Sequence, residues 1–203
     1  MIDILILTHN RPHLFKRCIS SLINTIPDHL RAEVKIYVNN DSDDIEEILT
    51  DLYIEYSYIK SDDLSIIYKY LFDKSSSKYV WYLEDDDFSL DFWDDIDFEK
   101  DLNFLNFKLS NTLEAIEERK KEFMLPKINS TFQLSQLFFK RSTVTKFPTG
   151  NALDNDYNLY LEIIQNMKSS KLIKKYCWVQ TKDGKDNISD ASLNKDLRWK
   201  ICL

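Results

Sequence analysis

The chain has 203 residues, of which 43% are hydrophobic and 13% aromatic, so it is long enough to bury the core of one domain. Its formal net charge is −7 and it has no long run of Lys or Arg, which argues against nucleic acid as the main partner. Only two glycines occur, Gly150 and Gly184, which excludes both a G-x-G-x-x-G dinucleotide loop and a Walker A loop. Any bound phosphate must therefore be held in another way.

The cysteines and the N-terminus indicate the compartment. Cys18, Cys177 and Cys202 are odd in number and far apart, which indicates neither a disulfide framework nor a zinc site. The chain opens directly on a strand pattern without a signal peptide, and it has no run of about 20 apolar residues that could span a membrane. We expect a protein of the reducing cytoplasm, with peripheral attachment at a membrane face as an option.

The first 88 residues alternate between strand and helix patterns. Short apolar runs predict four strands, at Ile2–Leu7, Val34–Val38, Tyr53–Ile59 and Val80–Leu83. Apolar residues at helical spacing predict a helix in each interval. Residues that favour helix starts precede these helices: Asn10, Asp41 or Ser42, and Asp62 or Asp63. This order is typical of an α/β fold with a mostly parallel, doubly wound central sheet flanked by helices.

The pattern is looser from residue 89 to the C-terminus. Strands are expected within Asn103–Leu109, Thr131–Lys140 and Leu172–Thr181. The charged segment Asn111–Phe123 predicts an exposed helix, and a second helix follows the polar loop Phe147–Asp156. With no internal repeat and no linker-like composition, we expect a single domain over residues 1–203.

Four consecutive carboxylates, Glu84 to Asp87, follow the fourth predicted strand directly. Parallel strands end at one edge of a sheet, and ligands collect there. The polar turns after the first, second and fourth strands are therefore expected to meet. Gathered carboxylates repel one another unless a cation lies among them, and their hard oxygens suit Mg²⁺ or Mn²⁺. A solvated acidic loop is the alternative.

Five motifs in order resemble nucleotide-sugar glycosyltransferases with the GT-A fold, especially those of family 2. ILILTHNRP is similar to the family's opening strand and turn, VNNDSDD to its second turn, and YLEDDDF to its metal-binding D-x-D. QLFFKRSTV with LDNDYNLYLEI resembles the later strand and the acidic helix start, and VQTKDGKDNIS resembles the closing strand and loop. The resemblance covers most of the chain.

The resemblance implies a role for each matched residue on the donor side. Thr8, Asn10 and Arg11 would line the nucleotide pocket, with Arg11 near the diphosphate; a surface position in the first helical turn is the alternative for Arg11. Asn39 or Asn40 would contact the base or ribose, unless they serve only the turn. Asp86 would bind Mn²⁺ or Mg²⁺, with Asp87 beside it, while Glu84 or Asp85 would reach the ribose or a metal-bound water.

The resemblance also implies the catalytic base. Asp156, at a helix start, would take the proton from an acceptor hydroxyl, which leads to inversion at the anomeric carbon. Asp154 is the alternate base, and capping of the helix is the alternative role for Asp156. Asn155 stands where the family commonly has Glu, a departure from its pattern.

The function implied is transfer of one sugar from a nucleotide-diphosphate sugar, with UDP the expected nucleotide, to a glycan, a lipid-linked glycan or another hydroxyl acceptor. Residues 1–88 would form the nucleotide-sugar-binding half and residues 89–203 the acceptor-binding half. Trp93, beside the acidic stretch, is a candidate for stacking on a sugar ring. Processive synthesis is not expected, because Lys195 replaces the Gln of the Q-x-x-R-W motif.

Two other functions compete with the transferase. A haloacid-dehalogenase-like phosphatase also has D-x-D after a buried strand, but early in the chain and followed by Thr or Ser, whereas Phe88 follows Asp87 here. A GT-A domain that binds nucleotide without turnover is the other, because Asn39, Asn40 and Asn155 stand where acids are expected.

Overall fold

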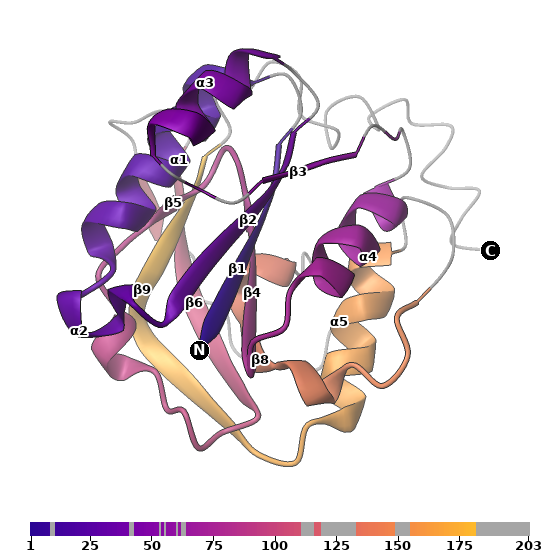
Figure 1. The fold of residues 1–203 in the computed structure, drawn as a ribbon. Helices are drawn as coiled ribbons and strands as arrows, with labels where there is room; N and C mark the ends of the chain where they lie inside the picture. Colours follow the sequence, from indigo (N-terminus) through magenta and orange to yellow (C-terminus); the bar gives the residue numbers. More distant parts are fainter. Residues whose placement is uncertain are drawn as a thin grey trace, which may run out of the picture.

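A computed structural model describes residues 1–8, 11–40, 43–52, 54, 56–59, 61, 64–110, 116–118, 133–148 and 155–181. Within these ranges, nine strands form one sheet in the order β3-β2-β1-β4-β8-β6-β9-β5, and β7 pairs with β6 outside that path. Helices cover both faces of the sheet, with α1 and α3 on one side and α4 and α5 on the other (Figure 1). This is the α/β architecture that the sequence predicts.

The N-terminal half is a parallel unit. Its strands are β1 (Ile2–Leu7), β2 (Val34–Asn40), β3 (Tyr56–Tyr58) and β4 (Tyr79–Glu84), and all pair in parallel. The helices between them are α1 (Pro12–Thr25), the short α2 (Asp28–Arg31), α3 (Asp43–Asp51) and α4 (Leu64–Lys74). The predicted alternation of strands and helices is confirmed, with α2 as an unpredicted addition.

The C-terminal half adds antiparallel pairs, so the sheet as a whole is mixed. Its elements are β5 (Phe88–Ser89), η1 (Trp93–Asp95), β6 (Leu102–Ser110), β7 (Ile116–Glu118), η2 (Leu134–Gln136), β8 (Leu137–Lys140), η3 (Arg141–Thr143), α5 (Asn155–Asn166) and β9 (Ser170–Thr181). Strand β8 is antiparallel to both β4 and β6, whereas β9 is parallel to β6. The strands predicted at Asn103–Leu109 and Leu172–Thr181 are confirmed as β6 and β9.

The helix predicted over Asn111–Phe123 is wrong where the structure describes that segment. Ile116–Glu118 forms β7, which pairs antiparallel with Lys108–Ser110 of β6. The helix prediction rested on Glu and Lys, whose helix propensity is a weak preference that pairing with a neighbouring strand overrides. The other residues of the segment lie outside the described part of the chain.

Two apolar layers explain the continuous hydrophobic strands. Ile4 and Ile6 of β1 pack with α1 and α3, while Leu5 and Leu7 pack with α4 and α5. Because both faces of such a strand are buried, apolar residues follow one another without alternating with polar ones. The exception is Asp3, which is fully buried and accepts hydrogen bonds from the Ser76 N–H, the Ser77 N–H and the Ser77 hydroxyl.

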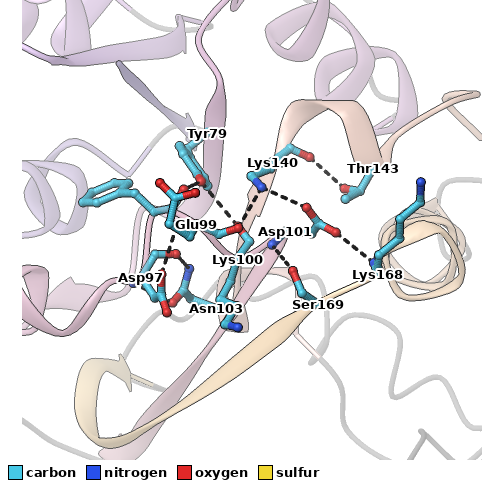
Figure 2. Close-up of polar contacts among 11 residues, drawn as sticks. Tyr79, Asp97, Glu99, Lys100, Asp101, Asn103, Lys140, Thr143, Lys168 and Ser169 are labelled. Atoms are coloured by element: carbon cyan, nitrogen blue, oxygen red, sulfur yellow. Dashed lines mark hydrogen bonds and ion pairs between the residues drawn. The ribbon is translucent and has the colours of Figure 1, made fainter.

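A polar cluster closes the edge of the sheet where β4 and β6 begin (Figure 2). The Asp101 carboxylate accepts a hydrogen bond from the Lys140 ammonium at 3.0 Å and another from the Lys168 backbone N–H at 2.9 Å. The Asp101 N–H donates to the Ser169 hydroxyl at 3.1 Å. These contacts join β6, β8 and the turn between α5 and β9.

In the described part of the chain, no helix combines the length and the apolar character that crossing a membrane requires.

Candidate active site

Strands β1, β2 and β4 end at the same edge of the sheet. The strand register pairs Leu7 with Glu84 and Ile6 with Val38. Thr8, Asn39 and the four acids therefore lie at neighbouring strand ends. The expected convergence is confirmed for these strand ends, whereas residues 9, 10, 41 and 42 of the turns lie outside the described part of the chain.

The Asn39 side chain connects two of these strand ends. The Thr8 backbone N–H donates to Asn39 Oδ1 at 3.0 Å, and Asn39 Nδ2 donates to the Thr8 carbonyl oxygen at 2.9 Å. Asn39 is fully buried. The contact of Asn39 with a nucleotide stays a prediction, while the contribution of its amide to the turn is observed.

Three of the four acids are buried, so the alternative of a solvated acidic loop is wrong. Asp85, Asp86 and Asp87 are buried and Glu84 is partly exposed. The turn closes where the Asp87 N–H donates to the Glu84 carbonyl oxygen at 3.2 Å. Helix α1 packs against it, with Arg17 Nη2 donating to the Asp86 carbonyl oxygen at 2.7 Å.

Glu84, Asp86 and Asp87 fit a divalent cation. Each offers one carboxylate oxygen, and these three atoms lie within 4.8 Å of one another. Asp87 Oδ1 is buried and has no hydrogen-bond partner among the described residues. A buried carboxylate oxygen without a donor is costly unless a cation compensates it, and carboxylates are the ligands that Mg²⁺ and Mn²⁺ prefer.

The pKa values of the acids reflect their crowding. Burial, followed by the charges of Asp86, Asp156 and Asp85, raises the pKa of Glu84 to about 8. Burial and the charges of Asp86 and Glu84 likewise raise the pKa of Asp87 well above its ordinary value. Both shifts indicate a site that favours an added positive charge, whether a proton or a cation.

Arg11 supplies a positive charge beside this cluster. It occupies the N-cap position of α1, where the sequence predicts Asn10 as the cap, and makes no side-chain capping bond. Its guanidinium instead contacts both Asp85 oxygens, with Nε at 3.2 Å from Oδ2, and Nη1 lies 3.4 Å from Asp86 Oδ2. Burial lowers the pKa of Arg11, but the charges of Asp85, Asp86 and Glu84 outweigh it and the net shift is upward. The alternative of a surface arginine is wrong, because its side chain is only 16% exposed.

Asp156 joins the site from the other half of the chain. It lies inside the first turn of α5, which begins at Asn155, rather than at the cap position. Its charge contributes to the raised pKa values of Glu84 and Tyr68. Helices α4 and α5 share one apolar layer, and this packing carries Asp156 toward the strand ends.

Some predicted site residues lie beyond what the structure describes. These are Asn10, Asp154 and the side chain of Asn40. One prediction is wrong: Trp93 is 1% exposed and packs against Trp81 and Phe92, so it cannot stack on a sugar. The indole is apolar enough to complete the core beneath η1.

Two further residues, Arg17 and Tyr68, are connected with the site and have no predicted role. Arg17 of α1 donates to the turn that carries the acids, and the charges of Glu84 and Asp156 contribute to the raised pKa of Tyr68 on α4. A cation facing an acidic turn could have been sought on α1, where Arg17 follows Arg11 by less than two turns. No comparable sequence signal distinguishes Tyr68 from the other buried residues of α4.

The family profile named Glycosyl transferase family 2 matches residues 3–149. The chain belongs to glycosyl transferase family 2. The resemblance of its motifs to this family is thereby confirmed, and the family favours a transferase over a haloacid-dehalogenase-like phosphatase. A search of curated proteins gave no significant match.

Solved structures from S. aureus share the fold of this family 2 chain. TarS 1-349 in complex with UDP-GlcNAc has a TM-score of 0.72 at 14% identity, covering 93% of this chain and 60% of that one. TarS 1-349 in complex with UDP has a TM-score of 0.69 at 13% identity, covering 89% and 60%. The structure of TarS has a TM-score of 0.72 at 14% identity, covering 89% of this chain and 36% of that one. The likeness confirms the GT-A fold, and the chain spans about 60% of the two shorter structures.

Proposed function

We propose that this chain is a metal-dependent, inverting glycosyltransferase that moves one sugar from a nucleotide-diphosphate sugar to a hydroxyl acceptor. The observation that carries the proposal is the grouping of the Glu84, Asp86 and Asp87 carboxylates, with Arg11 beside them, where strands β1 and β4 end. UDP is the proposed nucleotide because a similar structure holds UDP-GlcNAc.

Glu84, Asp86 and Asp87 would hold Mn²⁺ or Mg²⁺. When bound, such a cation neutralises the charge that develops on a departing diphosphate. The chain has two glycines and no glycine-rich phosphate loop, so positive charge from side chains must do more of this work. Arg11 supplies that charge next to the acids.

Thr8, Asn10, Arg11, Asn39 and Asn40 are proposed to line the nucleotide site. The Thr8 hydroxyl oxygen is buried without a hydrogen-bond partner among the described residues, which leaves it able to bond a ligand. Among the described residues, the Asn39 amide bonds only to Thr8, which leaves one of its N–H groups and one lone pair for a ligand. Thr8 and Asn39 together thus offer both donors and acceptors to a ribose or base.

Asp156 is proposed as the general base, with Asp154 as the alternate. An acceptor hydroxyl would give its proton to the Asp156 carboxylate while its oxygen bonds to the anomeric carbon. The bond from that carbon to the diphosphate oxygen breaks on the opposite face, so the configuration inverts. Residues 89–203 would then bind a glycan or lipid-linked glycan acceptor.

A thermal-shift screen tests the proposal. UDP, GDP, CDP and dTDP are added with and without Mn²⁺, and we expect UDP with Mn²⁺ to raise the melting temperature most. Asp86→Ala should abolish this shift, while Asp28→Ala, at a side chain that is 94% exposed, should leave it unchanged. No stabilisation by any nucleotide in the presence of metal would contradict the proposal.

Hydrolysis of the UDP-sugar donor distinguishes an enzyme from a binding domain. We expect slow release of UDP from the wild type and none from Asp86→Ala. A protein that binds UDP with Mn²⁺ but neither hydrolyses nor transfers any UDP-sugar would instead be a nucleotide-binding GT-A domain without turnover.

A further inference from the structure

We propose that Asp85 is a positioning residue that anchors Arg11 at the rim of the cation site, where Arg11 and the divalent cation share Asp86. The inference rests on the proposed function and deepens it. It assigns different tasks to adjacent carboxylates: Glu84, Asp86 and Asp87 hold the cation, and Asp85 holds the arginine.

The first observation is the geometry of the Arg11–Asp85 pair. Arg11 Nε lies 3.2 Å from Asp85 Oδ2, and Arg11 Nη2 contacts the other oxygen, Oδ1. A guanidinium that engages both oxygens of one carboxylate is held in position and in orientation. The Asp85 side chain is fully buried, and both of its carboxylate oxygens contact Arg11.

The second observation is that Asp86 both contacts Arg11 and belongs to the group of acids that could hold a cation. Its Oδ2 lies 3.4 Å from Arg11 Nη1, a longer contact than the fork on Asp85. The same carboxylate contributes an oxygen to the group formed with Glu84 and Asp87. Asp85 is absent from that group among the described residues. Arg11 is therefore a counter-charge at the site before any cation enters.

The shared carboxylate leads to competition. A divalent cation attracts Asp86 more strongly than one guanidinium does, because Coulomb attraction scales with charge. When the cation binds, Arg11 gives up its long contact to Asp86 but stays attached to Asp85. Its Nη1, released from Asp86, would then be able to contact a bound diphosphate. Without Asp85, Arg11 would settle on Asp86 and oppose the cation.

A double-mutant cycle on Mn²⁺ affinity tests this, measured without nucleotide by electron paramagnetic resonance of free Mn²⁺. The four proteins are the wild type, Arg11→Met, Asp85→Asn and the double variant. We expect Arg11→Met to bind Mn²⁺ more tightly, and Asp85→Asn to bind it about tenfold more weakly. In the Arg11→Met background, Asp85→Asn should change Mn²⁺ affinity by less than about twofold, since no arginine remains to occupy Asp86.

Equal fold-changes for Asp85→Asn in both backgrounds would overturn the inference, because they would reflect only the lost negative charge. If Arg11→Met does not fold because Asp85 is left buried beside an apolar group, Arg11→Gln replaces it, since its amide can still donate to Asp85. The same expectations apply to Arg11→Gln.

Donor kinetics give a second readout. Asp85→Asn should raise KM for the UDP-sugar at saturating Mn²⁺ more than it lowers kcat, since Arg11 loses its anchor but the base is untouched. A wild type that binds no Mn²⁺ would refute the proposed function itself. A wild type that binds Mn²⁺ but gives an additive cycle would refute only the role of Asp85.

Discussion

The Asn39 carboxamide joins the ends of β1 and β2 by exchanging two hydrogen bonds with the backbone of Thr8. Thr8 N–H donates to Asn39 Oδ1 at 3.0 Å, and Asn39 Nδ2 donates to the Thr8 carbonyl at 2.9 Å. Only a group that both donates and accepts can make this pair, so the amide at this position has a structural reason. The pairing of Leu7 with Glu84 places Thr8 at the strand end next to the acids.

Asn39→Asp is expected to destabilise the protein, although the resemblance suggests that relatives often have Asp here. The substitution removes the donor to the Thr8 carbonyl and places a carboxylate at a fully buried position. A loss of about 2–3 kcal/mol in the free energy of unfolding is expected. Urea unfolding measures it, with Asn24→Asp on the exposed face of α1 as the matched control. Equal stability of Asn39→Asp and wild type would show that the two hydrogen bonds between Asn39 and Thr8 add little to the free energy of unfolding.

Stability in the presence of a chelator should fall as the pH rises from about 4.5 to about 8. The pKa of Glu84 is raised in the folded protein from 4.5 to about 8, so across this window the folded state binds a proton that the unfolded state lacks. The stabilisation of the folded state that comes from protonated Glu84 is fully present below pH 4.5 and is lost as the pH rises through 8. The raised pKa of Asp87 acts in the same direction.

Melting temperatures at pH 5 to 8.5 measure this trend. Glu84→Gln, which cannot ionise, should reduce the fall in melting temperature with pH. Glu47→Gln, at an exposed position of α3, should leave that fall unchanged. Added Mn²⁺ should oppose the fall, because metal binding replaces the proton. A chelated wild type whose stability rises steadily over this range would contradict the account of the site.

Asp101→Asn should weaken the polar cluster where β4 and β6 begin, without changing the affinity for nucleotide. The hydrogen bonds from Lys140 and Lys168 lower the pKa of Asp101, so its stabilisation is present above its ordinary value of 3.8 and is lost on acidification. We expect a cost of about 1 kcal/mol near neutral pH and a smaller cost in acid. Chemical unfolding at two pH values checks this, with exposed Asp94→Asn as the control. A cost independent of pH would refute the role of the charge.

Asp156→Asn should retain UDP binding and lose transfer. An asparagine of the same shape keeps the first turn of α5 but cannot accept the acceptor proton, so a fall in kcat of about 10²- to 10⁴-fold is expected. The thermal shift with UDP and Mn²⁺ should persist, which distinguishes loss of the base from loss of the donor site. Unchanged transfer by Asp156→Asn would move the role of base to another residue, with Asp154 the first to test.

Several features of this protein follow from its sequence alone. Strands such as Ile2–Leu7 and helices such as Pro12–Thr25 are set by local apolar period, so their order and the parallel N-terminal sheet are predictable. The position of the acids follows too, because a run that comes directly after a buried strand must emerge at the edge of the sheet. The family is readable for the same reason, since its motifs are local.

The tertiary structure decided the rest, because those features depend on contacts between distant segments. The turn that ends β4 directs Asp85 to Arg11 and leaves Glu84, Asp86 and Asp87 grouped together, a division that the run of four acids in the sequence does not reveal. Packing of α5 beside α4 carries Asp156 to the site, and pairing with β6 makes a strand of Ile116–Glu118. In each case the energy of long-range packing or pairing outweighs local preference, and a single sequence shows only the preference.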